Sequence, residues 1–215
     1  MALYDLEEQE QLSQIKAWWD QYGKYVTTLI VVAALGSVGW QGWNWYQNKQ
    51  AGEASTLYFA VQQAAADGDA TRAREAAGQI IERYSGTAYA EMGALLSAAV
   101  QVAEGEPRNA RAQLEWVVAN ADNPAVRDLA RLRIAVTLFD EGDHDGALAR
   151  LADAPHASLA ARYGDLRGDV LAAAGRPDEA RRAYEAALAA LAEAPGQSGA
   201  QLRGVVETKI EALES

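Results

Sequence analysis

The chain contains no cysteine and only two histidines in 215 residues. Without thiols it has no disulfide framework, no cysteine nucleophile and no thiolate ligands for a metal ion. His144 and His156 do not stand in a spacing typical of metal ligands. Phosphate-binding glycine loops and the G-x-S-x-G turn of serine hydrolases are missing as well. The sequence therefore predicts a protein that is not an enzyme and that has no cofactor.

Positive charge is also scarce, because 19 lysines and arginines stand against 30 aspartates and glutamates, a net charge of -11. A chain this acidic repels the phosphate backbone, so we expect no nucleic acid among its partners. The segment Glu141–Gly146 resembles the beginning of a calcium loop. Ala152, however, occupies the twelfth position, where a bidentate carboxylate is required, and we interpret the segment as a solvated turn.

Aromatic residues make up only 8% of the chain, and patterns typical of β-strands are absent beyond Gly52. Half of the residues are apolar, and many of these are alanine, which favours helices and lets them pack closely. The composition predicts an all-α fold.

One segment has no charged residue at all, from Tyr25 to Trp45, between Lys24 and Lys49. About 20 helical residues cross a hydrocarbon core of roughly 30 Å. We therefore predict a transmembrane helix at residues 24–46. It separates a short acidic tail, residues 1–23, from a helical domain at residues 47–215.

Aromatic side chains gather at both ends of this predicted span, where amphipathic rings favour the lipid headgroups. A buried core helix would not need such rings, and an interfacial helix would show a polar face. A cleaved signal peptide with a small-x-small site at Ala34–Gly36 stays an alternative, although an acidic stretch precedes it where a basic one is typical. We predict as anchors in the membrane interface Trp18, Trp19, Tyr22, Tyr25, Trp40, Trp43 and Trp45.

The lysines that flank the span and the glycines within it bear on its orientation and on its contacts with other helices. Lys16 and Lys24 precede the span and Lys49 follows it, a one-charge excess that favours a cytoplasmic N-terminus. Glycines recur every third residue and form a stripe where another helix could approach closely. Glycine is also simply common in membrane helices, so the stripe remains a possible helix contact: Gly36, Gly39 and Gly42.

A short phrase, G-x-x-x-x-A, returns four times in the second part of the chain. It begins at Gly68, Gly105, Gly142 and Gly175, at spacings of 37, 37 and 33 residues. Each copy follows one alanine-rich stretch and precedes another, which predicts a helix, a turn at a glycine, and a second helix.

A helix–turn–helix unit with a period near 34 resembles the tetratricopeptide repeat. Small residues seven positions before the glycines support this, at Ala98, Ala135 and Gly168, whereas most aromatic residues of the consensus are missing. We predict a solenoid of about four degenerate repeats over residues 53–191. Ser198 to Ser215 would form a C-terminal capping helix with Ser198 as its N-cap.

By this resemblance, residues ten, six and three positions before each turn glycine would line a peptide groove. The apolar members in question are Tyr58, Leu95, Leu132, Val136 and Phe139. They suit apolar segments of unfolded clients. A register shifted by one residue would instead make them core, and the C-terminal helix could also fill the groove.

The chain as a whole resembles the ancillary subunits of the bacterial Sec translocon, the YfgM-like family. The similarity runs through Ile15–Trp19, Gly39–Trp45 and Ala130–Ala135, and is most specific in Asp165–Leu188. It implies a single-pass protein of the bacterial inner membrane with its N-terminus in the cytoplasm and its repeats in the periplasm.

The resemblance further implies three partners: the Sec translocon, a membrane-anchored periplasmic chaperone, and unfolded secretory clients passed between them. Two other functions remain open. The repeats could be an assembly scaffold that holds folded partners without touching clients, or the chain could be a regulator whose acidic tail binds a cytoplasmic protein.

Overall fold

The computed structural model describes residues 2–193 and 197–214, and all regular structure within these ranges is helical. The chain divides into two compact units, residues 1–50 and 51–215. The elements are α1 (Ala2–Ala66), α2 (Ala70–Tyr84), α3 (Ala88–Ala103), α4 (Pro107–Asn120), α5 (Pro124–Asp140), α6 (His144–Arg150), the 3₁₀ turn η1 (Ala157–Leu159), α7 (Ala160–Ala173), α8 (Pro177–Glu193) and α9 (Gln197–Ala212). The prediction of an all-α fold is confirmed.

The first unit is formed by the N-terminal part of α1, which contains the whole predicted span. Among the described residues this is the one helix long and apolar enough to cross a membrane, and its apolar window is not buried by the rest of the chain. A core helix of a soluble protein would be mostly buried. No proline interrupts α1, and it therefore continues through residues 47–52 into the first repeat instead of ending at residue 46.

The four glycines of the repeated phrase have positive φ angles, between 69° and 80°: Gly68, Gly105, Gly142 and Gly175. Each is followed by the same hydrogen-bond pattern. The N–H of Asp69, for example, donates to Ala64 O at 2.9 Å, and the N–H of Gly68 donates to Ala65 O at 3.3 Å. This pair of bonds satisfies the last carbonyls of the helix and requires a left-handed residue, for which glycine pays no steric penalty.

The second helix of each pair begins with a local signal in the sequence. Proline opens α4 and α8, where the missing N–H is not needed. Aspartates cap α2 and α6, because Asp69 Oδ1 accepts from the N–H of Arg72 and Asp143 Oδ1 from the N–H of Gly146, both at 2.9 Å. The predicted turns and helix starts at these positions are confirmed.

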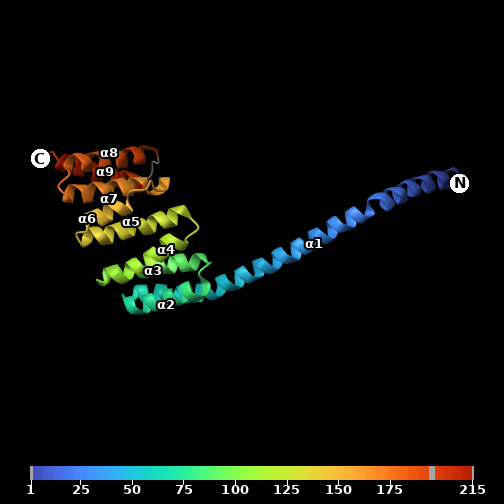
Figure 1. The fold of residues 1–215 in the computed structure, drawn as a ribbon, viewed down its shortest axis with the longest axis horizontal. Coiled ribbons are helices and arrows are strands. Elements are labelled where there is room, and N and C mark those ends of the chain that lie inside the picture. Colours follow the sequence, from blue (N-terminus) through green and yellow to red (C-terminus); the bar gives the residue numbers. More distant parts are fainter. Residues whose placement is uncertain (1, 194–196, 215) are drawn as a thin grey trace. The chain divides into compact units, whose positions relative to one another are not determined.

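Helices that are neighbours in sequence pack into a stack of antiparallel pairs within the second unit (Figure 1). The C-terminal part of α1 pairs with α2 around Val61 and Ile80. Next, α3 and α4 enclose Leu114 and Val117, and α7 and α8 enclose Tyr184. Alanine fills the crossings, so that the backbones approach closely.

The third pair departs from this regularity, because α6 has only seven residues. The loop after it is held by Asp128 of α5, whose Oδ2 accepts from the N–H of His156 at 2.7 Å. The carbonyl of Asp128 accepts from the Tyr163 hydroxyl of α7 at 2.8 Å. One residue therefore ties the loop and the fourth pair to the third.

The C-terminal helix α9 covers the end of the stack, as predicted, and buries Val206 against α7 and α8. The prediction of an N-cap serine was wrong. The helix already includes Gln197, so Ser198 lies inside its first turn.

Candidate protein-interaction surface

The predicted groove residues all lie on the first helices of the repeat pairs, but they differ in exposure. Leu132 is only 8% exposed and packs with Tyr163 and Val170. Leu95 and Phe139 are half-buried against neighbouring clusters, and the Tyr58 ring contacts the Tyr89 ring at a tilt of 47°, with 5.7 Å between centroids. Val136, by contrast, is 37% exposed.

An apolar hollow of about 290 Å³ opens between α3 and α5. We call it the α3–α5 hollow. Its exposed wall consists of Ala99 and Val102 from one helix and Val136 from the other, and Leu114 of α4 forms its floor. Ala99, Val102 and Val136 occupy the predicted groove positions, so the structure brings these three together.

A second hollow, of about 530 Å³, is lined by residues of α5, η1, α7, α8 and α9. Leu132 and Val136 contribute to it from α5, Asp165 and Asp169 from α7, and Leu202 from α9. Since Val136 borders both hollows, they adjoin each other. The C-terminal helix thus narrows the surface at the fourth repeat and leaves it open at the second and third.

Arg133 is the charged residue of the α3–α5 hollow. Its Nη1 donates to the backbone carbonyl of Leu95 at 2.8 Å, across from α5 to α3. Burial lowers the pKa of its guanidinium, which nevertheless stays charged at neutral pH. Sequence reasoning missed this residue. An arginine within an otherwise apolar helix face was the signal that could have indicated it.

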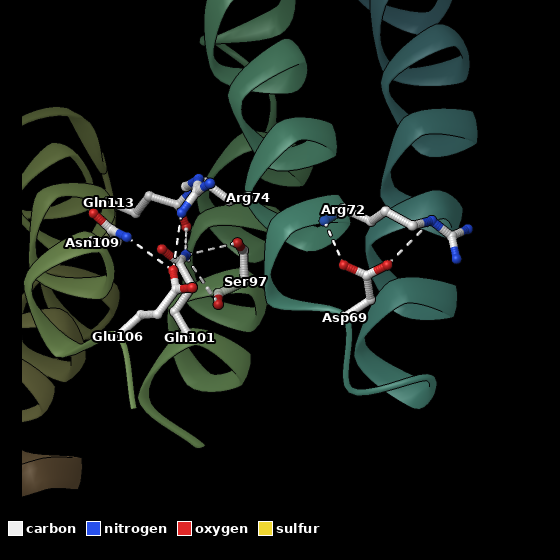
Figure 2. A network of polar contacts seen from close by, with 8 residues as sticks. All are labelled: Asp69, Arg72, Arg74, Ser97, Gln101, Glu106, Asn109 and Gln113. Carbon is white, nitrogen blue, oxygen red and sulfur yellow. Dashed lines mark hydrogen bonds and ion pairs between the residues drawn. The ribbon is translucent and has the colours of Figure 1, made fainter. Parts of the chain in front are cut away.

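A polar network joins α3 and α4 (Figure 2). The fully buried Gln101 donates to Ser97 Oγ and to Gln113 Oε1, both at 3.0 Å. Nearby, Arg74 of α2 pairs with Glu106 at 2.9 Å. Because a buried amide needs its partners in place, this network restricts the relative position of the two helices.

The acidic part of the second hollow is occupied by a lysine from α9. Lys209 Nζ lies 2.6 Å from Asp165 Oδ1 and 2.8 Å from Asp169 Oδ2. Burial alone would lower the pKa of Lys209, but the two carboxylates together raise it. The Tyr184 hydroxyl also donates to Asp169, at 2.8 Å, and burial together with this bond raises the pKa of Tyr184. These charges are satisfied within the fold.

The predicted anchors lie in the first unit, and their side chains are all exposed there: Trp18, Trp19, Tyr22, Tyr25, Trp40, Trp43 and Trp45. The predicted helix-contact glycines face open space, with no atom within 4 Å of an added Cβ: Gly36, Gly39 and Gly42. A residue spacing of three places them near one face of the helix.

Two carboxylates of the calcium-like segment, Glu141 and Asp143, have structural partners. Asp143 caps α6, and Glu141 Oε2 accepts from Arg111 Nη1 at 2.8 Å. In the described part of the chain no group of three histidine, aspartate or glutamate side chains is placed to hold a metal ion. The α3–α5 hollow, with its apolar wall and the partly desolvated Arg133, is therefore the candidate interaction surface.

Comparison with known proteins shows which family the chain is similar to. The model of the tetratricopeptide repeat-like domain family matches residues 16–215. The ancillary SecYEG translocon subunit of Haemophilus influenzae is 31% identical over 204 residues, 93% of each chain. That of Neisseria gonorrhoeae is 29% identical over 85% of this chain and 88% of its own. The Escherichia coli subunit is 27% identical, over 87% and 90%. No solved structure matches the chain.

These similarities cover nearly the whole chain, including the candidate span, the repeats and the capping helix. The relatives are named as translocon subunits and not as enzymes. The chain therefore belongs to the family of ancillary SecYEG translocon subunits, which carry a tetratricopeptide repeat-like domain.

Proposed function

We propose that this protein is an ancillary subunit of the SecYEG translocon, anchored in the bacterial inner membrane by residues 24–46. The observation that carries the proposal is the match along 93% of the chain to a protein of that name. An exposed apolar helix followed by a helical-repeat unit is the arrangement that such a role needs. The N-terminal tail lies in the cytoplasm and the repeats lie in the periplasm.

In this position the repeats receive secretory proteins as they leave the translocon and pass them to a membrane-anchored periplasmic chaperone. The open apolar hollow between the second and third repeats supports this part of the proposal, because unfolded chains expose apolar segments. The aromatic rings hold the repeat unit at the membrane surface. The glycines at 36, 39 and 42 give a translocon or chaperone helix a place to pack closely.

Topology and association can be tested on the full chain. A reporter that is active only in the periplasm, fused after Ser215, should be active; a silent reporter would contradict the orientation. SecYEG should co-purify with the wild-type chain. Gly39→Leu should reduce that association, whereas Gly52→Leu, outside the stripe and also facing open space, should not.

Client binding needs a separate test, because an assembly scaffold would associate with SecYEG in the same way. The full chain in lipid nanodiscs should slow the aggregation of an unfolded secretory protein more than empty nanodiscs do. An acidic membrane protein without repeats is the second control. Equal aggregation in all three samples, with SecYEG still co-purifying, would favour the scaffold.

A further inference from the structure

Arg133 is partly buried, yet it makes no ion pair within the residues that the structure describes. Two residues earlier on the same helix, Arg131 pairs with Asp128 at 2.9 Å. From the preceding second helix, Arg111 pairs with Glu141 at 2.8 Å. Arg133 has five N–H donors, and its one described bond goes to the neutral carbonyl of Leu95.

This position is also partly withdrawn from water. Burial is what lowers the pKa of Arg133, and no carboxylate contributes to that shift. A desolvated cation without a counter-charge is unfavourable, and an arriving carboxylate would relieve that cost. The Arg133 guanidinium is therefore a favourable position for binding an anion.

The residues around Arg133 indicate which class of ligand would carry the carboxylate. Ala99, Val102 and Val136 form an apolar wall beside the guanidinium. At about 290 Å³ the hollow is at the lower limit of pockets that enclose a small molecule, so it fits side chains of a peptide better than a free ligand.

The hollow does not end at Val136, which also borders the space beside Leu132 and Asp165. A bound peptide can continue from one hollow into the next, so a chain terminus is not required here. The two aspartates of that second space are paired with Lys209, and the other cation on its lining, Arg162, is exposed to water and not desolvated like Arg133.

We propose that the α3–α5 hollow binds an internal peptide segment of a partner protein, with an apolar side chain against Val102 and Val136 and an aspartate or glutamate paired with Arg133. This inference rests on the proposed function as a protein-binding scaffold and specifies the segment that it binds. Because the chain carries a net charge of -11, segments with many acidic residues are repelled. One carboxylate among apolar residues is the preferred composition.

The test uses the full chain in nanodiscs of uncharged lipid and two fluorescein-labelled peptides of leucine, alanine and serine. One peptide has a single central glutamate, and the other has glutamine at that position. Fluorescence anisotropy should show the glutamate peptide binding about tenfold more tightly, the size expected of one charge-assisted hydrogen-bonded pair. This comparison uses only the wild-type protein and does not depend on how a variant folds.

Arg133→Gln should remove the preference, so that both peptides bind equally. Arg108→Gln is the matched control, since Arg108 is an exposed arginine of α4 outside the hollow, and it should leave the preference intact. Equal binding of the two peptides to the wild-type chain would overturn the proposal. So would a preference that persists in Arg133→Gln, or the absence of any peptide binding.

The two proposals can fail separately. If SecYEG co-purifies with the wild-type chain and the peptides bind equally, the segment specificity is wrong and the translocon role stands. If the peptides are discriminated through Arg133 but SecYEG does not co-purify, the translocon role is wrong and the binding site stands.

Discussion

The backbones of α7 and α8 approach each other closely at Gly164 of α7. A Cβ added there would lie 2.9 Å from the carbonyl oxygen of Ala183 and 3.0 Å from the backbone nitrogen of Ala187, both in α8. Backbone atoms cannot move aside by changing a rotamer, so Gly164→Ala has to push α7 away from α8. Overpacking of this kind costs about 1–3 kcal/mol.

The same substitution gains helix propensity, because alanine is favoured over glycine by about 1 kcal/mol inside a helix. Gly78 in the middle of α2 separates the two effects. An added Cβ meets nothing within 4 Å there, so Gly78→Ala should stabilise its helix by about 1 kcal/mol. The propensity gain cancels between the variants, and Gly164→Ala should be less stable than Gly78→Ala by about 1–3 kcal/mol.

Hydrogen exchange of the full chain in nanodiscs, followed by mass spectrometry, measures the two sites separately. Amides of α7 and α8 should exchange faster in Gly164→Ala, about fivefold for a net loss of 1 kcal/mol, and those of α2 should exchange more slowly in Gly78→Ala. If Gly164→Ala slowed exchange in α7 and α8 as much as Gly78→Ala slows it in α2, the two backbones would not be in contact at Gly164. That result would refute the reasoning.

Three further outcomes follow from the polar contacts of the fourth repeat. Tyr184→Phe should lower the free energy of unfolding by about 1.5–3 kcal/mol in thermal or urea melts, since it removes a bond to a carboxylate, whereas Tyr58→Phe should have little effect. Burial, followed by the charge of Asp128, raises the pKa of Tyr163 from 10.0 to about 12. On raising the pH, the unfolded chain therefore loses the Tyr163 proton before the folded chain does, and the free energy of unfolding should fall between pH 10 and 12. In Tyr163→Phe this fall should be smaller. An alkaline melting curve that Tyr163→Phe leaves unchanged would contradict the assignment. Asp128→Ala removes the carboxylate that accepts from the His156 N–H but leaves the backbone carbonyl that accepts from Tyr163. Hydrogen exchange should therefore rise in the loop after α6 while α2 stays protected, and uniform acceleration along the chain would argue against a local tie.

Local signals explain which parts of the fold were predictable. The four turns depend on glycine at positive φ, and that requirement is visible in the sequence as a repeated glycine. Proline marks the beginning of α4 and α8 for the same local reason. No proline stands at residues 47–52, so α1 continues past residue 46, and the end of the span there stays a prediction.

The surface was harder to predict, since exposure depends on how neighbouring helices pack. Leu132 and Val136 lie one turn apart on the same helix, yet one is buried by Tyr163 and Val170 and the other opens into two hollows. The role of Arg133 could not be predicted from the sequence, because it depends on its hydrogen bond to Leu95 and on the absence of a carboxylate beside it among the described residues. Periodicity identifies a helix face, but the partner helix decides which of its residues remain accessible.

The seven-residue helix α6 has a consequence for how the repeat array melts. In a linear array, stability passes from one repeat to the next only through their shared interfaces. The third repeat has lost half of its second helix, and the backbone carbonyl and carboxylate of Asp128 replace part of the missing interface. The array is therefore a chain of cooperative units with one weak coupling, at which the fourth repeat and α9 can open while the first two repeats stay folded.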